Sequence, residues 1–335
     1  MQAAIASPVL ESGPSTARPN SFRQEPSPAK AFVPLHSHEN LSRAATSGVA
    51  AAARLRRSEC VILAFLVYAA LASVAIPIAP ALRTRTLLLN LAILALYSLL
   101  IRADTLRPRL VTAVTRDWLA LALVLLAYRE VGWLALPHTT HALELRWVAW
   151  DRALLRGGLK AAVEALGPVL PSILEVAYSL VYTLAPFCVA ILYLSGERER
   201  VERFLLVFAT AVLLCYVLLP FWPSEPPRTV FPGVDVPAYL TIFRRFNLWM
   251  LAGAGIHTGV FPSAHVAGAF GAAFGMLRAG ATRRWVQPFL FTMAALIALA
   301  VVYGRYHYLA DAGAGFLMAV AALALSHLLH WRPFR

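Results

Sequence analysis

The chain has 335 residues, of which 59% are hydrophobic and 14% charged, and its formal net charge is +13. Soluble domains are about 45–50% apolar and about 25% charged, and a soluble globule of this size could not hide so much apolar surface from water. The composition therefore excludes a soluble enzyme, a disulfide-stapled secreted domain and a wholly disordered chain, and it predicts a membrane protein.

Residues 1–58 differ from the rest, because they are rich in Ala, Ser and Pro and show no sustained apolar period. Such a segment buries too little apolar surface to offset its ordering entropy, so we predict a disordered tail. An organelle transit peptide is the alternative, although Glu11, Glu25 and Glu39 weigh against it, and a secretory signal is not indicated because no apolar run begins before Val61.

Eight apolar runs follow the tail, and most approach the ~20 residues that a membrane span needs. Continuous apolar runs are typical of helices, whereas a barrel strand alternates. We therefore predict an all-α fold, a polytopic bundle of about eight transmembrane helices, in which the second and sixth runs are short. The predicted spans are 61–82, 86–101, 118–136, 172–194, 204–221, 264–279, 285–304 and 309–330.

The cations between the spans predict the orientation. If the N-terminus is cytoplasmic, the inner segments carry more arginines than the outer segments, which favours both chain ends inside. Eight spans then place 137–171, 222–263 and 304–308 on the external face, and these segments hold the polar residues of chemical interest.

The first candidate motif opens the run at 264–279. Pro262 and Ser263 suit a helix start, where unpaired N–H groups can bind an anion, and His265 would face that anion from the first turn. The alternative is a capped helix with an interfacial histidine.

The second candidate motif is the pair His307 and Asp311, which share a helix face because they are four residues apart. A carboxylate can hold one imidazole nitrogen protonated and leave the other as base or nucleophile. Asp311 also lies inside an apolar span, where an ionised residue is costly and usually partnered. The alternative is a structural pair that ties two helix ends together.

The third candidate motif is proline-rich. Pro223, Pro226 and Pro227 stop the preceding helix and fix an extended segment that ends in Arg228, whose guanidinium suits phosphate oxygens. A loop with a headgroup-facing arginine is the alternative. Together the three motifs supply the parts for phosphoryl transfer without metal ligands.

Residues 172–325 resemble the type 2 phosphatidic acid phosphatase superfamily, and specifically its inositol-phosphorylceramide synthase-like branch. The resemblance rests on Pro226-Pro227-Arg228, on Pro262-Ser263-Ala264-His265, and on His307-x-x-x-Asp311 followed by Ala312-Gly313. It implies a six-helix phosphatase-like core, with 1–58 as tail, 59–136 as accessory helices and 137–335 as the phosphatase or phosphotransferase-like domain.

The resemblance also implies a role for each matching residue. His307 would attack phosphorus and form a phosphohistidine, and Asp311 would orient it. His265 would protonate the leaving alkoxide, while Arg228 and Ser263 would hold the phosphate oxygens.

The chain departs from the family pattern at two positions. Val301 stands where many members have an arginine, six residues before the nucleophile, and we expect Arg305 to replace it as a phosphate ligand. Ala264 stands where glycine is common.

We therefore expect a lipid phosphatase or phosphotransferase that acts at the external membrane face, in a bacterial inner membrane with its site toward the periplasm. Its substrate would be a lipid phosphate or phosphodiester, with water or an alcohol such as an inositol as acceptor, and no cofactor is expected. The rival function is a transporter or structural membrane protein; it is less favoured because no internal repeat of broken helices is visible.

Other polar and aromatic residues have plainer interpretations. The segment 147–152 is expected to anchor at the interface through Trp147 and Trp150, or to line a headgroup path. Arg129 and Glu130 are expected to snorkel, or to grip a headgroup. His138 and His141 do not predict a metal site, because no carboxylate stands at ligand spacing. Tyr178 and Tyr182 are expected to pack in the core.

Overall fold

The computed structural model describes residues 55–107, 109–136, 140–256, 258–280 and 283–330, which lie within one compact unit, Thr46–Arg335. These residues form helices and loops and contain no strand, which confirms the all-α fold. Of the predicted tail, 1–54 falls outside the described residues, and its last two residues already belong to the first described helix, α2 (Arg57–Ala75).

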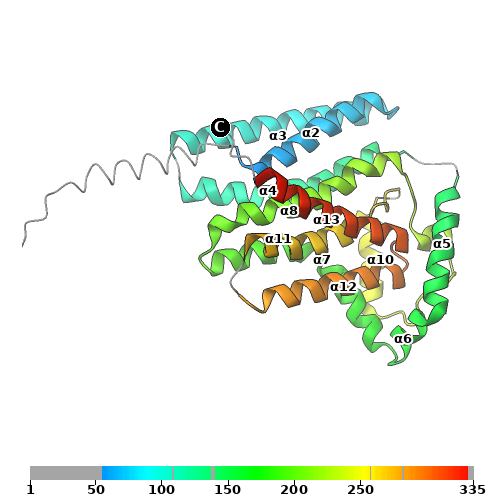
Figure 1. Cartoon of the computed structure of the whole chain (residues 1–335). Helices are drawn as coiled ribbons and strands as arrows, with labels where there is room; N and C mark the ends of the chain where they lie inside the picture. The colour runs from blue at the N-terminus through cyan, green and yellow to red at the C-terminus, as the bar shows by residue number, and fades with distance from the viewer. Residues whose placement is uncertain (1–54, 108, 137–139, 257, 281–282, 331–335) are drawn as a thin grey trace, which may run out of the picture. The chain divides into compact units, whose positions relative to one another are not determined.

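Within the part of the chain that the structure describes, seven segments are long and apolar enough to cross a membrane. The sixth predicted span, 264–279, is helix α11 (Ala264–Ala279), which has 16 residues and is shorter than the ~20 that a full crossing needs. It packs against four of the long helices (Figure 1), and its many Ala and Gly residues allow that close approach. Besides α2, the long helices are α3 (Pro80–Leu106), α4 (Leu110–Leu134), α7 (Val169–Leu194), α8 (Val201–Leu218), α12 (Val286–Tyr303) and α13 (Leu309–His330).

The boundary between the first two spans differs from the prediction. Helix α2 ends at Ala75, and Ile76 is extended with ψ 140°, because the ring of Pro77 disfavours helical backbone in the residue before it. Pro80 then opens α3, where its missing N–H costs nothing. Helix α3 has 27 residues and extends beyond the predicted 86–101 at both ends. The prediction ended too early because the last turns of the helix contain polar residues, which interrupt the apolar run.

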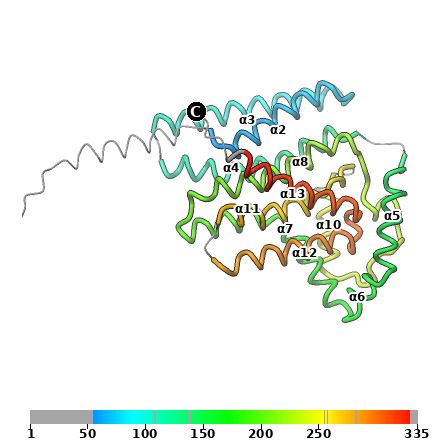
Figure 2. The backbone as a smooth tube through the Cα atoms, in the orientation of Figure 1, coloured from blue at the N-terminus to red at the C-terminus, as the bar shows by residue number. Residues whose placement is uncertain are grey.

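Short helices gather at one end of the long ones, where α5 (Ala142–Leu154) crosses their ends and contacts α13 (Figures 1 and 2). The others are α6 (Lys160–Glu164), α9 (Pro227–Val230) and α10 (Ile242–Ala254). They belong to the predicted segments 137–171 and 222–263, and the predicted segment 304–308 joins α12 to α13.

Helix α10 was not predicted. The reason is that its apolar residues are exposed and its polar residues are buried. Ile242 and Trp249 are 75% and 72% exposed, whereas Arg244 and Asn247 are buried. A helix with its apolar face outward and its polar face inward suits the membrane interface, and its mixed sequence resembles a polar loop when read alone.

Helices α2 and α4 both pack against α8, so the accessory helices adjoin the helices of the C-terminal domain. Glu130 lies in α4 and does not snorkel: it is fully buried and accepts a hydrogen bond of 2.8 Å from Asn90 of α3. That pairing corrects the interpretation made for Glu130 from the sequence.

Candidate active site

The site forms where the predicted external segments meet. Arg228 of α9, His265 of α11 and the loop residue His307 all line one cavity of about 380 Å³. The Nε2 atom of His307 lies 3.3 Å from Nδ1 of His265. The structure therefore brings together three residues that the sequence places far apart.

The loop between α12 and α13 holds His307 through a tight turn. A Cβ atom on Gly304 would lie 2.4 Å from Cε2 of Tyr306, so the turn requires glycine there. The next residue, Arg305, adopts a left-handed φ of 62°, and the N–H groups of Tyr306 and His307 both donate to the carbonyl of Val301. This turn fixes the direction of the imidazole before any substrate arrives.

The hydrogen bonds of His307 define its tautomer. Nδ1 lies 2.9 Å from the carbonyl oxygen of Val260 and 3.4 Å from Oδ2 of Asp311. A carbonyl oxygen only accepts, so Nδ1 carries the proton and Nε2 keeps its lone pair. Asp311 is itself oriented by the N–H of Tyr308, which donates to Oδ2 at 2.9 Å.

The first turns of α11 and α13 are joined at Ser263. Its Oγ accepts from the N–H of Val266 at 3.4 Å and caps α11, and its N–H donates to the carbonyl of Asp311 at 3.0 Å. A Cβ atom on Gly315 would lie 2.3 Å from the backbone carbonyl oxygen of Ser263, so glycine at 315 permits α13 to approach the start of α11 this closely. Ser263 is fully buried and is not among the residues that line the cavity.

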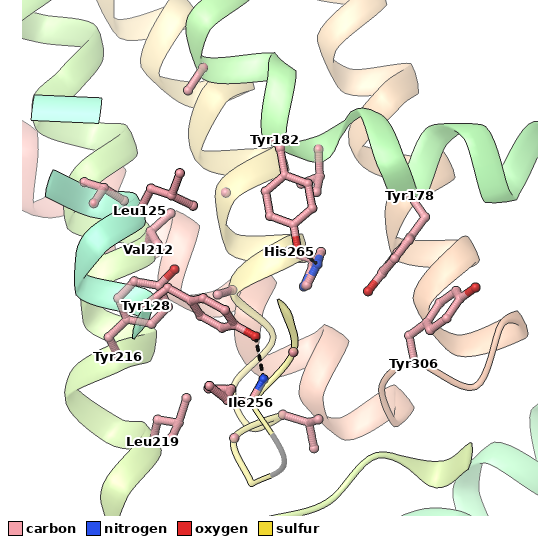
Figure 3. A pocket seen from close by; sticks show the side chains of 18 of the residues that line it. Leu125, Tyr128, Tyr178, Tyr182, Val212, Tyr216, Leu219, Ile256, His265 and Tyr306 are labelled. Carbon is pink, nitrogen blue, oxygen red and sulfur yellow. Dashed lines mark hydrogen bonds between the residues drawn. The ribbon is translucent and has the colours of Figure 1, made fainter. Parts of the chain in front are cut away.

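Two tyrosines of α7 hold the His265 ring (Figure 3). The hydroxyl of Tyr182 lies 3.2 Å from Nε2 of His265, and the ring of Tyr178 stacks on it with centroids 4.9 Å apart. A hydroxyl can donate or accept, so Tyr182 can follow His265 between its neutral and protonated forms. The expected core packing is confirmed for Tyr178, which is 1% exposed, and is wrong for Tyr182, which is 46% exposed. Both tyrosines contact a candidate catalytic group.

Arg228 supplies positive charge to the cavity. Its Nη1 donates to the carbonyl of Tyr306 at 3.5 Å, and its Cζ lies 5.7 Å from the Tyr306 ring centroid. No salt bridge to Arg228 occurs among the residues that the structure describes. Without a carboxylate partner, this guanidinium remains available to an anion.

A sequence model of the PAP2 superfamily matches residues 146–325, more than half of the chain. The chain belongs to the PAP2 superfamily. No curated protein and no solved structure gives a match. Members of the superfamily are phosphatases or phosphotransferases, and the seven apolar helices make this member an integral membrane protein. Helices α2, α3 and α4 lie outside the matched residues.

In this PAP2 protein, Arg305 is not brought to the cavity with the other predicted residues. Its side chain is 0% exposed, and Nη1 donates to Oδ2 of Asp151 at 2.6 Å. The other oxygen of Asp151 accepts from the N–H of Leu309 at 2.8 Å. The ion pair of Arg305 and Asp151 therefore connects the loop that carries His307 to α5 and does not line the cavity.

Trp147 and Trp150 were interpreted as interfacial anchors, which is wrong for Trp147. Trp150 is 56% exposed, but Trp147 and Asp151 are buried, and the Trp147 ring stacks on Phe261 at 5.0 Å. Trp147 and Asp151 are four residues apart and so share a helix face. That spacing is the signal through which their inward role could have been found.

A second buried network supports the site and was missed altogether. The carboxylate of Glu175 accepts from Nη1 of Arg244 at 2.9 Å, from Nδ2 of Asn247 at 2.7 Å and from the hydroxyl of Tyr306 at 2.5 Å. These bonds join α7, α10 and the loop between α12 and α13, and they hold the Tyr306 ring beside Arg228.

Among the residues searched, no group of three or more His, Cys, Asp or Glu could hold a metal ion. Of the two histidines weighed as ligands, His138 lies outside the described residues. Nδ1 of His141 lies 3.6 Å from Oε1 of Glu144, three residues on, so the interpretation that no carboxylate stands at ligand spacing was wrong.

The protonation state of His307 yields a first prediction. Burial, together with the positive charge of Arg228, lowers the pKa of His307 from 6.5 to about 3, so the imidazole stays neutral at physiological pH. We expect its ¹⁵N chemical shifts to stay constant between about pH 5 and pH 8. Removing the cation in Arg228→Ala should move the pKa upward, and a His307 signal that titrates at pH 6.5 in the unmodified protein would contradict the prediction.

Proposed function

We propose that this PAP2 protein transfers the phosphoryl group of a lipid phosphate through a phosphohistidine at His307. One observation carries the proposal: His307, His265 and Arg228 line one cavity whose other walls are mostly apolar, and Nε2 of His307 lies 3.3 Å from Nδ1 of His265. Such a cavity suits a ligand with an anionic head and a hydrocarbon tail.

In the first step, the lone pair of His307 Nε2 forms a bond to phosphorus while the bond from phosphorus to the ester oxygen breaks. The electron pair of the broken bond leaves with that oxygen, which takes a proton that an O–H of the substrate phosphate has given to the His265 ring, and departs as the alcohol. Arg228 would bind the phosphate oxygens as charge shifts during the transfer. The products are phosphorylated His307 and neutral His265.

In the second step, an O–H group of the acceptor attacks phosphorus and its proton passes to His265. The phosphorus–nitrogen bond breaks, and its electron pair returns to Nε2 of His307. Water as acceptor yields inorganic phosphate, and an alcohol such as an inositol yields a new phosphate ester. Both outcomes restore the starting protonation of the two histidines.

Asp311 and Val260 serve this chemistry through Nδ1. The imidazole gains positive charge as Nε2 bonds to phosphorus, and the carboxylate 3.4 Å from Nδ1 stabilises that charge. In this role Asp311 is a positioning residue, and it needs no access to the cavity.

The proposed location is the outer leaflet. The cavity opens among the segments that the arginine distribution assigns to the external face, and for a bacterial inner membrane this face is the periplasm.

The proposal is tested with purified protein and a panel of lipid phosphates and phosphodiesters, with and without inositol. Mass spectrometry of the products identifies the acceptor: inorganic phosphate indicates hydrolysis, and a phosphorylated inositol indicates transfer. Absence of both products with every lipid would refute the proposal and favour the rival of a transporter or structural protein.

Arg228 yields a second prediction. Arg228→Ala should lower kcat/KM by about 10²–10³-fold, because it removes the cation from the developing charge on phosphate. Arg228→Lys should restore part of the activity, since an ammonium binds phosphate as a point charge without the bidentate fork. The matched control is Arg245→Ala, an exposed arginine of α10, and an equal loss in both alanine variants would count against the role.

A further inference from the structure

The cavity extends from the histidines deep between the helices, and its far end is apolar. Helix α4 lines it from Tyr128 near the histidines to Trp118. At 1.5 Å per residue these positions lie about 15 Å apart along the helix. This distance is about half of the ~30 Å hydrocarbon core, or one leaflet.

The lining residues of α4 occupy one face. Trp118, Ala122 and Leu125 follow each other at helical spacing and all line the cavity, yet Trp118 and Leu125 are 39% and 59% exposed. The cavity is therefore open toward the bilayer along this face. In Figure 3, Leu125 and Tyr128 of α4 lie across the cavity from Tyr182 of α7.

We propose that α4 binds the hydrocarbon chain of the substrate and limits its length at Trp118. The chain enters sideways from the bilayer and lies along α4, with its phosphate at Arg228 and His307. The inference rests on the proposed function, because the same cavity holds the phosphate site.

Two observations favour this occupant over a water-soluble phosphate. Ala185 and Pro186 of α7 and Phe208 and Val212 of α8 complete the walls, and a soluble ligand would leave these apolar surfaces without a partner. The volume of about 380 Å³ lies near the lower end of the ~300–1,000 Å³ typical of ligand pockets. It suits one chain, so a second chain of the lipid would stay in the bilayer.

The inference assigns substrate selectivity to a helix outside the residues matched by the PAP2 superfamily. Val181 of α7 and Val212 of α8 belong to the matched part and form the opposite walls. The residues matched by the superfamily would then carry out the chemistry, and α4 would determine which length of hydrocarbon chain is preferred.

The test measures kcat/KM for butyl, octyl, dodecyl, hexadecyl and eicosyl phosphate. For the unmodified protein we expect kcat/KM to rise with each added methylene that packs against α4, by less than the about fourfold of transfer from water because the chain leaves the bilayer, and to level off once the chain reaches Trp118. Ala122→Trp blocks the cavity midway, so it should lower the ratio of hexadecyl to butyl phosphate at least tenfold. Trp118→Ala should move the plateau to longer chains.

Val111→Trp is the matched control, because Val111 lies on the same helix, is exposed and does not line the cavity. It should keep the selectivity of the unmodified protein. A chain-length profile that is unchanged in both Ala122→Trp and Trp118→Ala would overturn the inference while leaving the proposed function intact.

A readout without turnover separates the two proposals. Hexadecyl phosphate with a photoreactive diazirine at its terminal carbon should label α4 near Trp118, and excess hexadecyl phosphate should remove the label. Labelling of α4 in a protein that releases no phosphate would refute the proposed function and support the chain site. Labels found only within 146–325 would overturn the chain site.

Discussion

His307→Ala should abolish turnover of lipid phosphates, with kcat/KM reduced on the order of 10⁴-fold or more, because no other group can take over a covalent step. The alanine also leaves the carbonyl of Val260 without its 2.9 Å hydrogen bond, which costs about 1 kcal/mol of stability. A loss of activity in folded protein is therefore the expected result, and phosphate release from a lipid phosphate measures it.

The intermediate offers a sharper version of the same experiment. In His265→Ala both the proton donor of the first step and the base of the second step are missing, so the phosphoryl group should reach His307 slowly and, once bound there, should persist. Radiolabelled substrate should then leave acid-labile, base-stable phosphate on the peptide that contains His307. In the double variant with His307→Ala, the label should disappear.

His327→Ala is the matched histidine control, because this exposed side chain lies on α13. It should retain full activity. Undiminished turnover in His307→Ala, or label on a different residue, would contradict the assigned nucleophile.

Much of the fold and part of the site were predictable because they depend on local signals. Apolar runs predict spans whatever they pack against, but the predicted span 61–82 ran through Pro77 and Pro80, which end α2 and begin α3. The four-residue spacing of His307 and Asp311 predicted their contact, although His307 lies in the loop before α13 and not on a shared helix. Ser263 caps α11 by accepting from the N–H of Val266, three residues away. Each of these interactions joins residues three or four positions apart.

The contacts that were missed join distant parts of the chain. Arg305 and Asp151 are separated by 154 positions, and no periodicity links them. The sequence suggested phosphate for Arg305 because the site needed a cation, and it could not show that a buried carboxylate already binds this arginine. Arg244 and Glu175 pose the same difficulty at a separation of 69.

Arg116 should be the most destabilising charged residue to remove from the accessory helices. Its Nε and Nη2 donate to the two oxygens of Glu59 at 2.7 Å each, and Nη1 donates to Oδ2 of Asp104 at 2.6 Å. Arg116 and Glu59 are each 1% exposed. One guanidinium thus joins the start of α4 to the start of α2 and the end of α3.

In Arg116→Ala, two carboxylates remain buried without this partner. Breaking a buried pair from one side costs about 3–5 kcal/mol, so the variant should unfold at a clearly lower Tm in mild detergent. Neutralising both acids as well, with Glu59→Gln and Asp104→Asn, should recover part of the loss, because the penalty arises from uncompensated charge.

Arg102→Ala provides the control, since this arginine is exposed near the end of α3 and surface substitutions cost within about 0.5 kcal/mol. A Tm for Arg116→Ala equal to that of Arg102→Ala would show that the network contributes little. The variant also tests how the accessory helices serve catalysis. Arg116 lies two residues before Trp118, so its removal should loosen the start of α4. The difference in kcat/KM between long and short chains should then become smaller. The hydrogen bonds of His307 and His265 lie at the other end of the helices and should stay in place.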